Sequence, residues 1–122
     1  MKRILIATAA TLALAAGTAA AGEADVLDVK AEKTGERTWR FEVTVEHADE
    51  GWEHYADQWQ VLAPDGGVLG TRTLYHPHVN EQPFTRSLGG VRVPADVTSV
   101  TVRARDKVHG HGGKAVTVEL PR

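Results

Sequence analysis

The chain has 122 residues, with 14 Lys and Arg against 16 Asp and Glu, so its formal charge is −2 when histidine is neutral. A nucleic-acid-binding domain is expected to carry a basic surface, and this charge balance argues against that function. The absence of cysteine excludes disulfides, thiol nucleophiles, zinc fingers, iron–sulfur clusters and blue-copper centres. Six histidines and the carboxylates are the side chains left for metal chemistry.

The first 21 residues have the three-part pattern of a secretory signal peptide. Lys2 and Arg3 supply the positive charge, residues 4–16 are apolar, and residues 17–21 end in small side chains. The apolar segment is shorter than the roughly 20 residues that a helix needs to cross a bilayer. We therefore predict cleavage after Ala21. This leaves one domain, residues 22–122, in the periplasm or outside the cell and without a membrane anchor.

From residue 22 onward, apolar and polar residues alternate with the period of half-buried β-strands. The clearest run is at residues 38–47, where two aromatic and two valine side chains share one face. Turn-forming residues separate the runs, most clearly at residues 64–67. The predicted strands are residues 25–32, 37–47, 57–63, 68–76, 84–92, 97–106 and 114–120. Seven short strands without a helix predict an all-β fold, a single antiparallel β-sandwich of the immunoglobulin or fibronectin-III kind.

Strand direction predicts where the histidines lie. If consecutive strands run alternately up and down, the loops at residues 47–56, 76–83 and 107–113 share one end of the sandwich. These loops hold all six histidines of the chain. We therefore predict a histidine cluster at this end that binds a metal, with ligands drawn from His47, His54, His76, His78, His109 and His111.

Two segments, residues 76–78 and 109–111, have the pattern His-x-His. In extended backbone, residues two apart point to the same side about 6.5–7 Å from each other. Two such imidazoles can converge on one ion at about 2.0–2.1 Å from each nitrogen. Each pair taken alone also fits two solvated loop side chains, and His47 also fits a histidine at the edge of the core. The preferred ligand set is His76, His78 and His109, joined by His111 or His47.

Imidazole ligands suit copper(II), zinc and nickel, and copper(II) has the highest affinity of the three. We therefore predict a periplasmic or secreted protein that carries, buffers or delivers copper(II) or zinc. The metal ion is its expected partner, and a periplasmic protein is a further candidate. Two alternatives stay open. One is a non-enzymatic interaction module with a recognition surface of histidine and aromatic side chains, and the other is a small metalloenzyme. Nucleophilic catalysis is poorly supported, because neither serine, Ser87 or Ser99, lies in a nucleophile-elbow motif.

Three segments carry a resemblance to known proteins. They are GWEHYADQW (51–59), YHPHVNEQPFTRSL (75–88) and RARDKVHGHGGK (103–114), and they resemble segments of small secreted bacterial proteins of unassigned function. In architecture the chain is similar to periplasmic copper-resistance proteins, which bind copper(II) on a β-sandwich. Those proteins use an N-terminal histidine, whereas the predicted mature chain begins with Gly22. Copper–zinc superoxide dismutases also mount His-x-His on a β-sandwich, but the disulfide cysteines of that family are missing here.

Overall fold

The computed structural model describes residues 22–121. The predicted signal peptide, residues 1–21, lies outside the described residues. No helix within residues 22–121 is long and apolar enough to cross a membrane. The described chain forms the strands β1 (Asp25–Lys33), β2 (Thr38–Glu46), β3 (Ala56–Leu62), β4 (Val68–Thr73), β5 (Phe84–Arg92), β6 (Ser99–Asp106) and β7 (Val116–Glu119).

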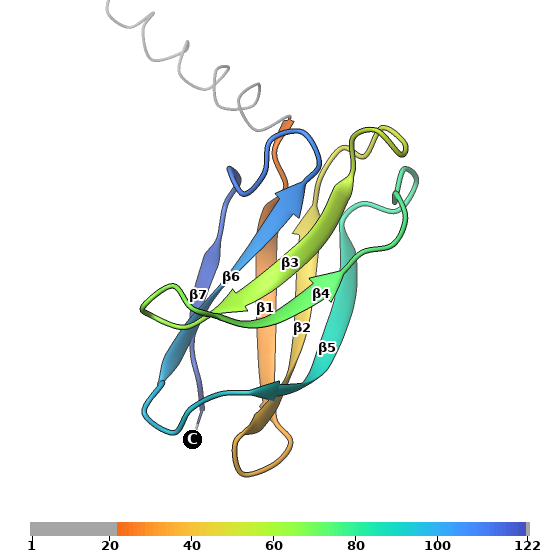
Figure 1. Ribbon diagram of the computed structural model, residues 1–122. Helices are drawn as coiled ribbons and strands as arrows, with labels where there is room; N and C mark the ends of the chain where they lie inside the picture. Colours follow the sequence, from red (N-terminus) through yellow and green to blue (C-terminus); the bar gives the residue numbers. More distant parts are fainter. Residues whose placement is uncertain (1–21, 122) are drawn as a thin grey trace, which may run out of the picture.

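The strands form two antiparallel sheets that face each other (Figure 1). One sheet has the order β1-β2-β5 and the other the order β4-β3-β6-β7. The predicted all-β sandwich of seven antiparallel strands is therefore confirmed. Its core lies between the two sheets, as expected for layers that each have one apolar face.

The alternation read from the sequence decides which side chains fill this core. The apolar residues of β2, at positions 39, 41, 43 and 45, are all buried, and so are those of β6 at positions 100, 102 and 104. The two largest buried side chains, Trp39 and Trp59, come from opposite sheets and belong to one core cluster. Burying a large apolar side chain contributes about 1.5–3 kcal/mol, so these strands hold the sandwich together.

The structure corrects the prediction in two strands. In β1, strict alternation through Val29 and Ala31 would bury Leu27, but Leu27 is exposed and Val26 is buried. A β-bulge between Val26 and Asp28 shifts the phase of the strand by one residue. The fourth strand ends at residue 73 rather than at residue 76. The segment 76–78 therefore lies in a loop and not at the end of a strand.

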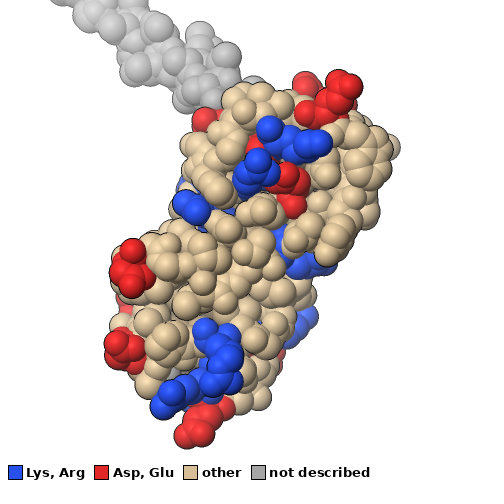
Figure 2. All heavy atoms as spheres, in the orientation of Figure 1, with Lys and Arg blue, Asp and Glu red and all other residues tan. Residues whose placement is uncertain are grey.

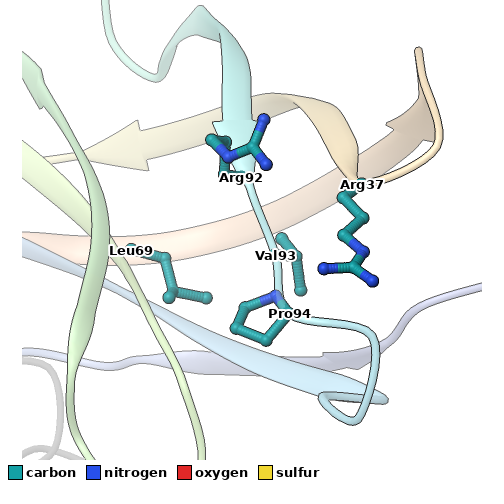
Figure 3. A pocket seen from close by; sticks show the side chains of 5 residues that line it. All are labelled: Arg37, Leu69, Arg92, Val93 and Pro94. Carbon is teal, nitrogen blue, oxygen red and sulfur yellow. The ribbon is translucent and has the colours of Figure 1, made fainter.

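The loops that hold the six histidines lie at one end of the sandwich. The β2–β3, β4–β5 and β6–β7 connections all turn at the upper end in Figure 1. The opposite end has a hollow of about 230 Å³ beside the β5–β6 connection, where Leu69, Val93 and Pro94 meet the side chains of Arg37 and Arg92 (Figure 3). On the face drawn in Figure 2, acidic and basic groups are interspersed.

Candidate metal centre

Two strands deliver a polar side chain into the upper end of the core. The inward phase of β2 continues to His47, and the inward phase of β6 continues to Asp106. His47 is 2% exposed and Asp106 is fully buried. Because β2 and β6 belong to different sheets, the two side chains approach each other across the sandwich. A polar residue in the apolar phase of a strand is the sequence signal for both. His47 was among the predicted ligands, whereas Asp106 was not.

A third side chain, His54 from the β2–β3 loop, completes a compact group. The Nε2 atoms of His47 and His54 are 3.2 Å apart, and Nε2 of His54 is 3.3 Å from Oδ1 of Asp106. Nε2 of His47 is 3.9 Å from Oδ2 of Asp106. Within residues 22–121, these three residues offer nitrogen and oxygen atoms that all lie within 4.8 Å of one another, as a metal site requires. We call His47, His54 and Asp106 the His-His-Asp group.

A carboxylate holds the far side of each imidazole in this group. Nδ1 of His47 lies 2.6 Å from Oδ1 of Asp49, and Nδ1 of His54 lies 3.0 Å from Oε1 of Glu50. An ionised carboxylate only accepts hydrogen bonds, so each Nδ1 is the N–H donor. In the neutral imidazoles both Nε2 atoms therefore carry lone pairs, and these lone pairs face each other. This is the outer arrangement typical of histidines that bind a metal through Nε2.

The carboxylate of Asp106 is satisfied on one oxygen only. Its Oδ1 accepts the backbone N–H groups of Val108 and His109, at 2.9 and 2.7 Å, and contacts Nδ1 of His109 at 3.1 Å. Its Oδ2 is buried without a hydrogen-bond partner among the described residues. Burial acts to raise the pKa of Asp106, but these donors and the nearby His47 outweigh it and lower the pKa. The group therefore stays ionised and keeps an uncommitted oxygen beside the two imidazoles.

His54 has the opposite shift. Its pKa is raised, first by the hydrogen bond to Glu50 and then, against the effect of burial, by the charge of Asp106. The site thus attracts positive charge to Nε2 of His54, which faces Nε2 of His47. A proton or a metal ion can supply that charge.

The geometry fits a transition metal of tetrahedral preference. Two ligands about 2.0–2.1 Å from an ion at the tetrahedral angle lie about 3.3 Å apart. The Nε2–Nε2 distance of 3.2 Å agrees with that separation, and Oδ2 of Asp106, the oxygen without a hydrogen-bond partner, lies 3.9 Å from Nε2 of His47. Two nitrogen donors and one carboxylate leave a further position in a four-coordinate site.

The other predicted ligands are placed differently. His109 lies at the margin of the group, with its ring centroid 5.0 Å from that of His54. His111, on the same loop, is exposed and lies outside the group. His76 and His78 lie in the β4–β5 loop with their ring centroids 4.7 Å apart, and the group includes neither. The structure therefore brings His47 and His54 together, with His109 beside them, rather than the preferred set of His76, His78 and His109.

Local contacts explain why His78 does not take part. Its ring stacks on Phe84 at a centroid distance of 4.0 Å, and its Nε2 lies 2.9 Å from Nη2 of Arg86, which donates to it. Burial first, and then the charge of Arg86, lower the pKa of His78. Because a guanidinium already occupies Nε2, this nitrogen is not presented to an ion.

Asp49 was not among the predicted site residues either. This buried carboxylate accepts the N–H of Ala56 at 3.1 Å and the N–H of His78 at 2.7 Å, in addition to Nδ1 of His47. It therefore connects the β2–β3 loop to the start of β3 and to the β4–β5 loop. Its position two residues after His47 continues the inward phase of β2, and this was the signal available in the sequence.

Comparison with known proteins gives one relative. A protein from Halomicrobium mukohataei with the description "Putative lipoprotein" is 45% identical over 97 residues, which are 80% of this chain and 47% of that protein. The chain thus spans about half the length of this relative. No protein-family model matches the chain, and no solved structure matches it significantly.

Proposed function

We propose that this chain is an extracytoplasmic metal-binding protein that carries, buffers or delivers copper(II) or zinc. The predicted signal peptide and the lipoprotein description of the relative both support a place outside the cytoplasm. The ligands are His47, His54 and Asp106, with His109 at the margin of the site. Asp49 and Glu50 are the positioning residues, because they orient the imidazoles without facing the ion.

One observation carries the proposal. Two imidazoles, each with Nδ1 committed to a carboxylate, present their Nε2 lone pairs to each other at 3.2 Å beside a buried carboxylate oxygen that has no hydrogen-bond partner. Buried polar atoms are normally satisfied, and those that are not need an explanation such as an ion. A bound metal ion satisfies all three atoms at once.

The test is a titration of the purified protein with copper(II) and, separately, with zinc, each against a competing chelator. We expect one ion per chain and a loss of affinity of at least about 100-fold in His54→Gln, because loss of an outer partner alone costs about 10–100-fold. Glutamine at this position can keep a polar contact with Glu50. Near-ultraviolet circular dichroism checks that the variant retains its fold.

His76→Ala and His111→Ala are the matched controls, because both histidines are exposed and lie outside the His-His-Asp group. We expect both controls to bind with the affinity of the parent chain. Equal binding by the parent chain and His54→Gln would contradict the proposed site. Loss of binding in the double variant His76→Ala/His78→Ala alone would instead place the ion in the β4–β5 loop.

A second candidate function rests on exposed apolar side chains at the same end. Trp52 is 63% exposed, Tyr75 73%, Val79 55% and Val108 60%, and they come from all three histidine-bearing loops. Large exposed apolar groups that gather on one face mark sites of protein association. This surface would suit a protein that donates or receives the metal. In a chain that binds no metal, it would make partner recognition the main function.

A further inference from the structure

The first described residues lie at the candidate metal centre. The described chain begins at the upper end of the sandwich, beside the β6–β7 loop (Figure 1). At Gly22, a Cβ atom would lie 2.7 Å from Cε1 and 3.0 Å from Nε2 of His109. The backbone of Gly22 is therefore in contact with the ring of His109, and glycine is the residue that permits this approach.

Neighbouring contacts hold Gly22 in this place. The N–H of Lys114 donates to Oδ1 of Asp25 at 2.7 Å, and the N–H of Val26 donates to the carbonyl of Lys114 at 2.8 Å. Ala24 is 1% exposed, and its carbonyl oxygen lies where a Cβ of Gly113 would be. The segment before β1 is thus fastened to the β6–β7 loop and is not a loose end.

Gly22 is also the residue that the signal-peptide pattern predicts as the first of the mature chain. Cleavage is hydrolysis of the Ala21–Gly22 peptide bond by a leader peptidase. Water supplies the hydroxyl of the new Ala21 carboxyl group, and a proton goes to the nitrogen of Gly22. We infer that this step makes the amino group of Gly22 a further ligand of the ion in the His-His-Asp group, so that removal of the leader raises metal affinity. The inference rests on the proposed function and names how the site is completed.

The chemistry of the nitrogen changes at that step. In the uncleaved chain its lone pair is delocalised into the carbonyl of Ala21, so it is a poor ligand. After cleavage it is a primary amine with an ordinary pKa of about 7.7–8.0, and a metal can displace its proton near neutral pH. Amine nitrogen belongs to the donors that copper(II) and zinc favour, and three protein donors leave a coordination position for it.

The backbone of Gly22 also reaches His54. The carbonyl of Gly22 accepts a hydrogen bond from the ring of His54, and this is among the causes that raise the pKa of His54, after the effects of Glu50 and Asp106. Gly22 thus contacts both imidazoles on the outer side of the site, His54 and His109. The new amino group belongs to this same residue.

The experiment compares two preparations that differ by one residue. In the first, the full chain is exported from a bacterial host with its own leader, and its intact mass gives the first residue. In the second, the chain begins at Ala21, so that its amino group is displaced by about 3.8 Å and the Gly22 nitrogen stays in a peptide bond. All seven strands and the described core lie after Ala21 in both preparations. Copper(II) and zinc are titrated separately against a chelator, and each preparation is also made with His54→Gln.

We expect the exported chain to begin at Gly22 and to bind at least about 10-fold more tightly than the chain that begins at Ala21. Labelling glycine with nitrogen-15 should change the nitrogen hyperfine pattern of bound copper(II) in the first preparation only. Equal affinities that both disappear in His54→Gln would overturn this inference and leave the proposed function standing. Cleavage at another bond would also overturn it. Absence of binding in both preparations would instead remove the proposed function.

Discussion

At the residue scale, the main feature is the pair of imidazole nitrogens that face each other. Two neutral lone pairs at 3.2 Å repel, so the arrangement of His47 and His54 is stable only with a positive charge at or between them. Without metal that charge is a proton, and the pKa of His54 is raised, first by the hydrogen bond to Glu50 and then by the charge of Asp106. A metal ion and a proton therefore compete for the same two nitrogens.

This competition predicts how affinity depends on pH. Because the pKa of His54 lies above its ordinary value of 6.5, zinc affinity should still rise with pH above 6.5, where an ordinary imidazole is already mostly neutral. The hydrogen bond to Glu50 is the largest cause of the shift, so in Glu50→Gln the rise should end at a lower pH. Chelator competition between pH 6 and pH 8.5 measures the profile, and NMR titration of the imidazoles measures the pKa.

Glu81→Gln is the control, because Glu81 is exposed at the same end of the sandwich and pairs with Arg86 at 3.2 Å. An unchanged profile in Glu50→Gln would show that this carboxylate does not set the pKa of His54.

The raised pKa of His54 also makes the stability of the metal-free fold depend on pH. Without metal, protonated His54 stabilises the fold. That contribution is fully present below pH 6.5 and is lost as the pH rises through the folded-state pKa.

At the element scale, buried carboxylates fasten the loops that form the site. Asp49 accepts N–H groups from Ala56 and His78 as well as from the ring of His47. Asp106 accepts the N–H groups of Val108 and His109 and so holds the start of the β6–β7 loop. Loops usually lie on the surface and move, so a precise metal site on loops needs such connections.

Asp49→Asn should therefore weaken both the fold and the site. Both oxygens of Asp49 accept N–H groups. Asparagine replaces one of these oxygens with an NH₂ group, so at least one N–H donor loses its acceptor and faces another donor. We expect a loss of about 1–3 kcal/mol in the free energy of unfolding, and metal affinity about 10–100-fold lower. Urea unfolding and chelator competition measure the two effects.

Asp65→Asn is the matched control, because Asp65 also accepts a backbone N–H, from Gly67 at 2.9 Å, but lies in an exposed turn. The control should change stability by less than about 0.5 kcal/mol, as is usual at exposed positions. Equal losses of unfolding free energy in the two variants would contradict the expectation that burial makes the hydrogen bonds of Asp49 more important for stability.

At the scale of the whole molecule, the site joins the two sheets. His47 follows β2 in the three-stranded sheet, and Asp106 ends β6 in the four-stranded sheet. The core between them is one cluster that includes Trp39 and Trp59. In the function proposed above, a metal ion held by both sheets closes one end of this core and binds the folded chain in preference to the unfolded chain.

Metal should therefore stabilise the entire fold. At a free concentration 100 times Kd, we expect the free energy of unfolding to increase by about 2.7 kcal/mol, or about 10–20 °C in Tm for a domain of this size. Far-ultraviolet circular dichroism and tryptophan fluorescence should report one common transition, and His54→Gln should remove the shift. An unchanged Tm with metal still bound would mean that the segment from His47 to His54 binds the ion without the fold.

The class of fold, and the end of the molecule where the histidines gather, can be predicted from the sequence alone. Both follow from period-two alternation and from the parity of strand direction, which are local properties of the chain. The same alternation carried His47 to the inward face, and burial in the structure agrees. It did not reveal the bulge in β1, because a bulge depends on how a strand pairs with its neighbour.

The tertiary structure decided which side chains meet. His-x-His spacing predicted His76 and His78 as ligands. In the structure, however, the ring of His78 stacks on Phe84 and accepts a hydrogen bond from Arg86, and both of these residues belong to β5. Asp106 joined the His-His-Asp group because β6 lies across the sandwich from β2. Such contacts join residues about 50 to 60 positions apart in the chain. Periodicity and spacing describe only neighbours along the backbone, so the packing of the two sheets had to bring Asp106 to His47 and His54.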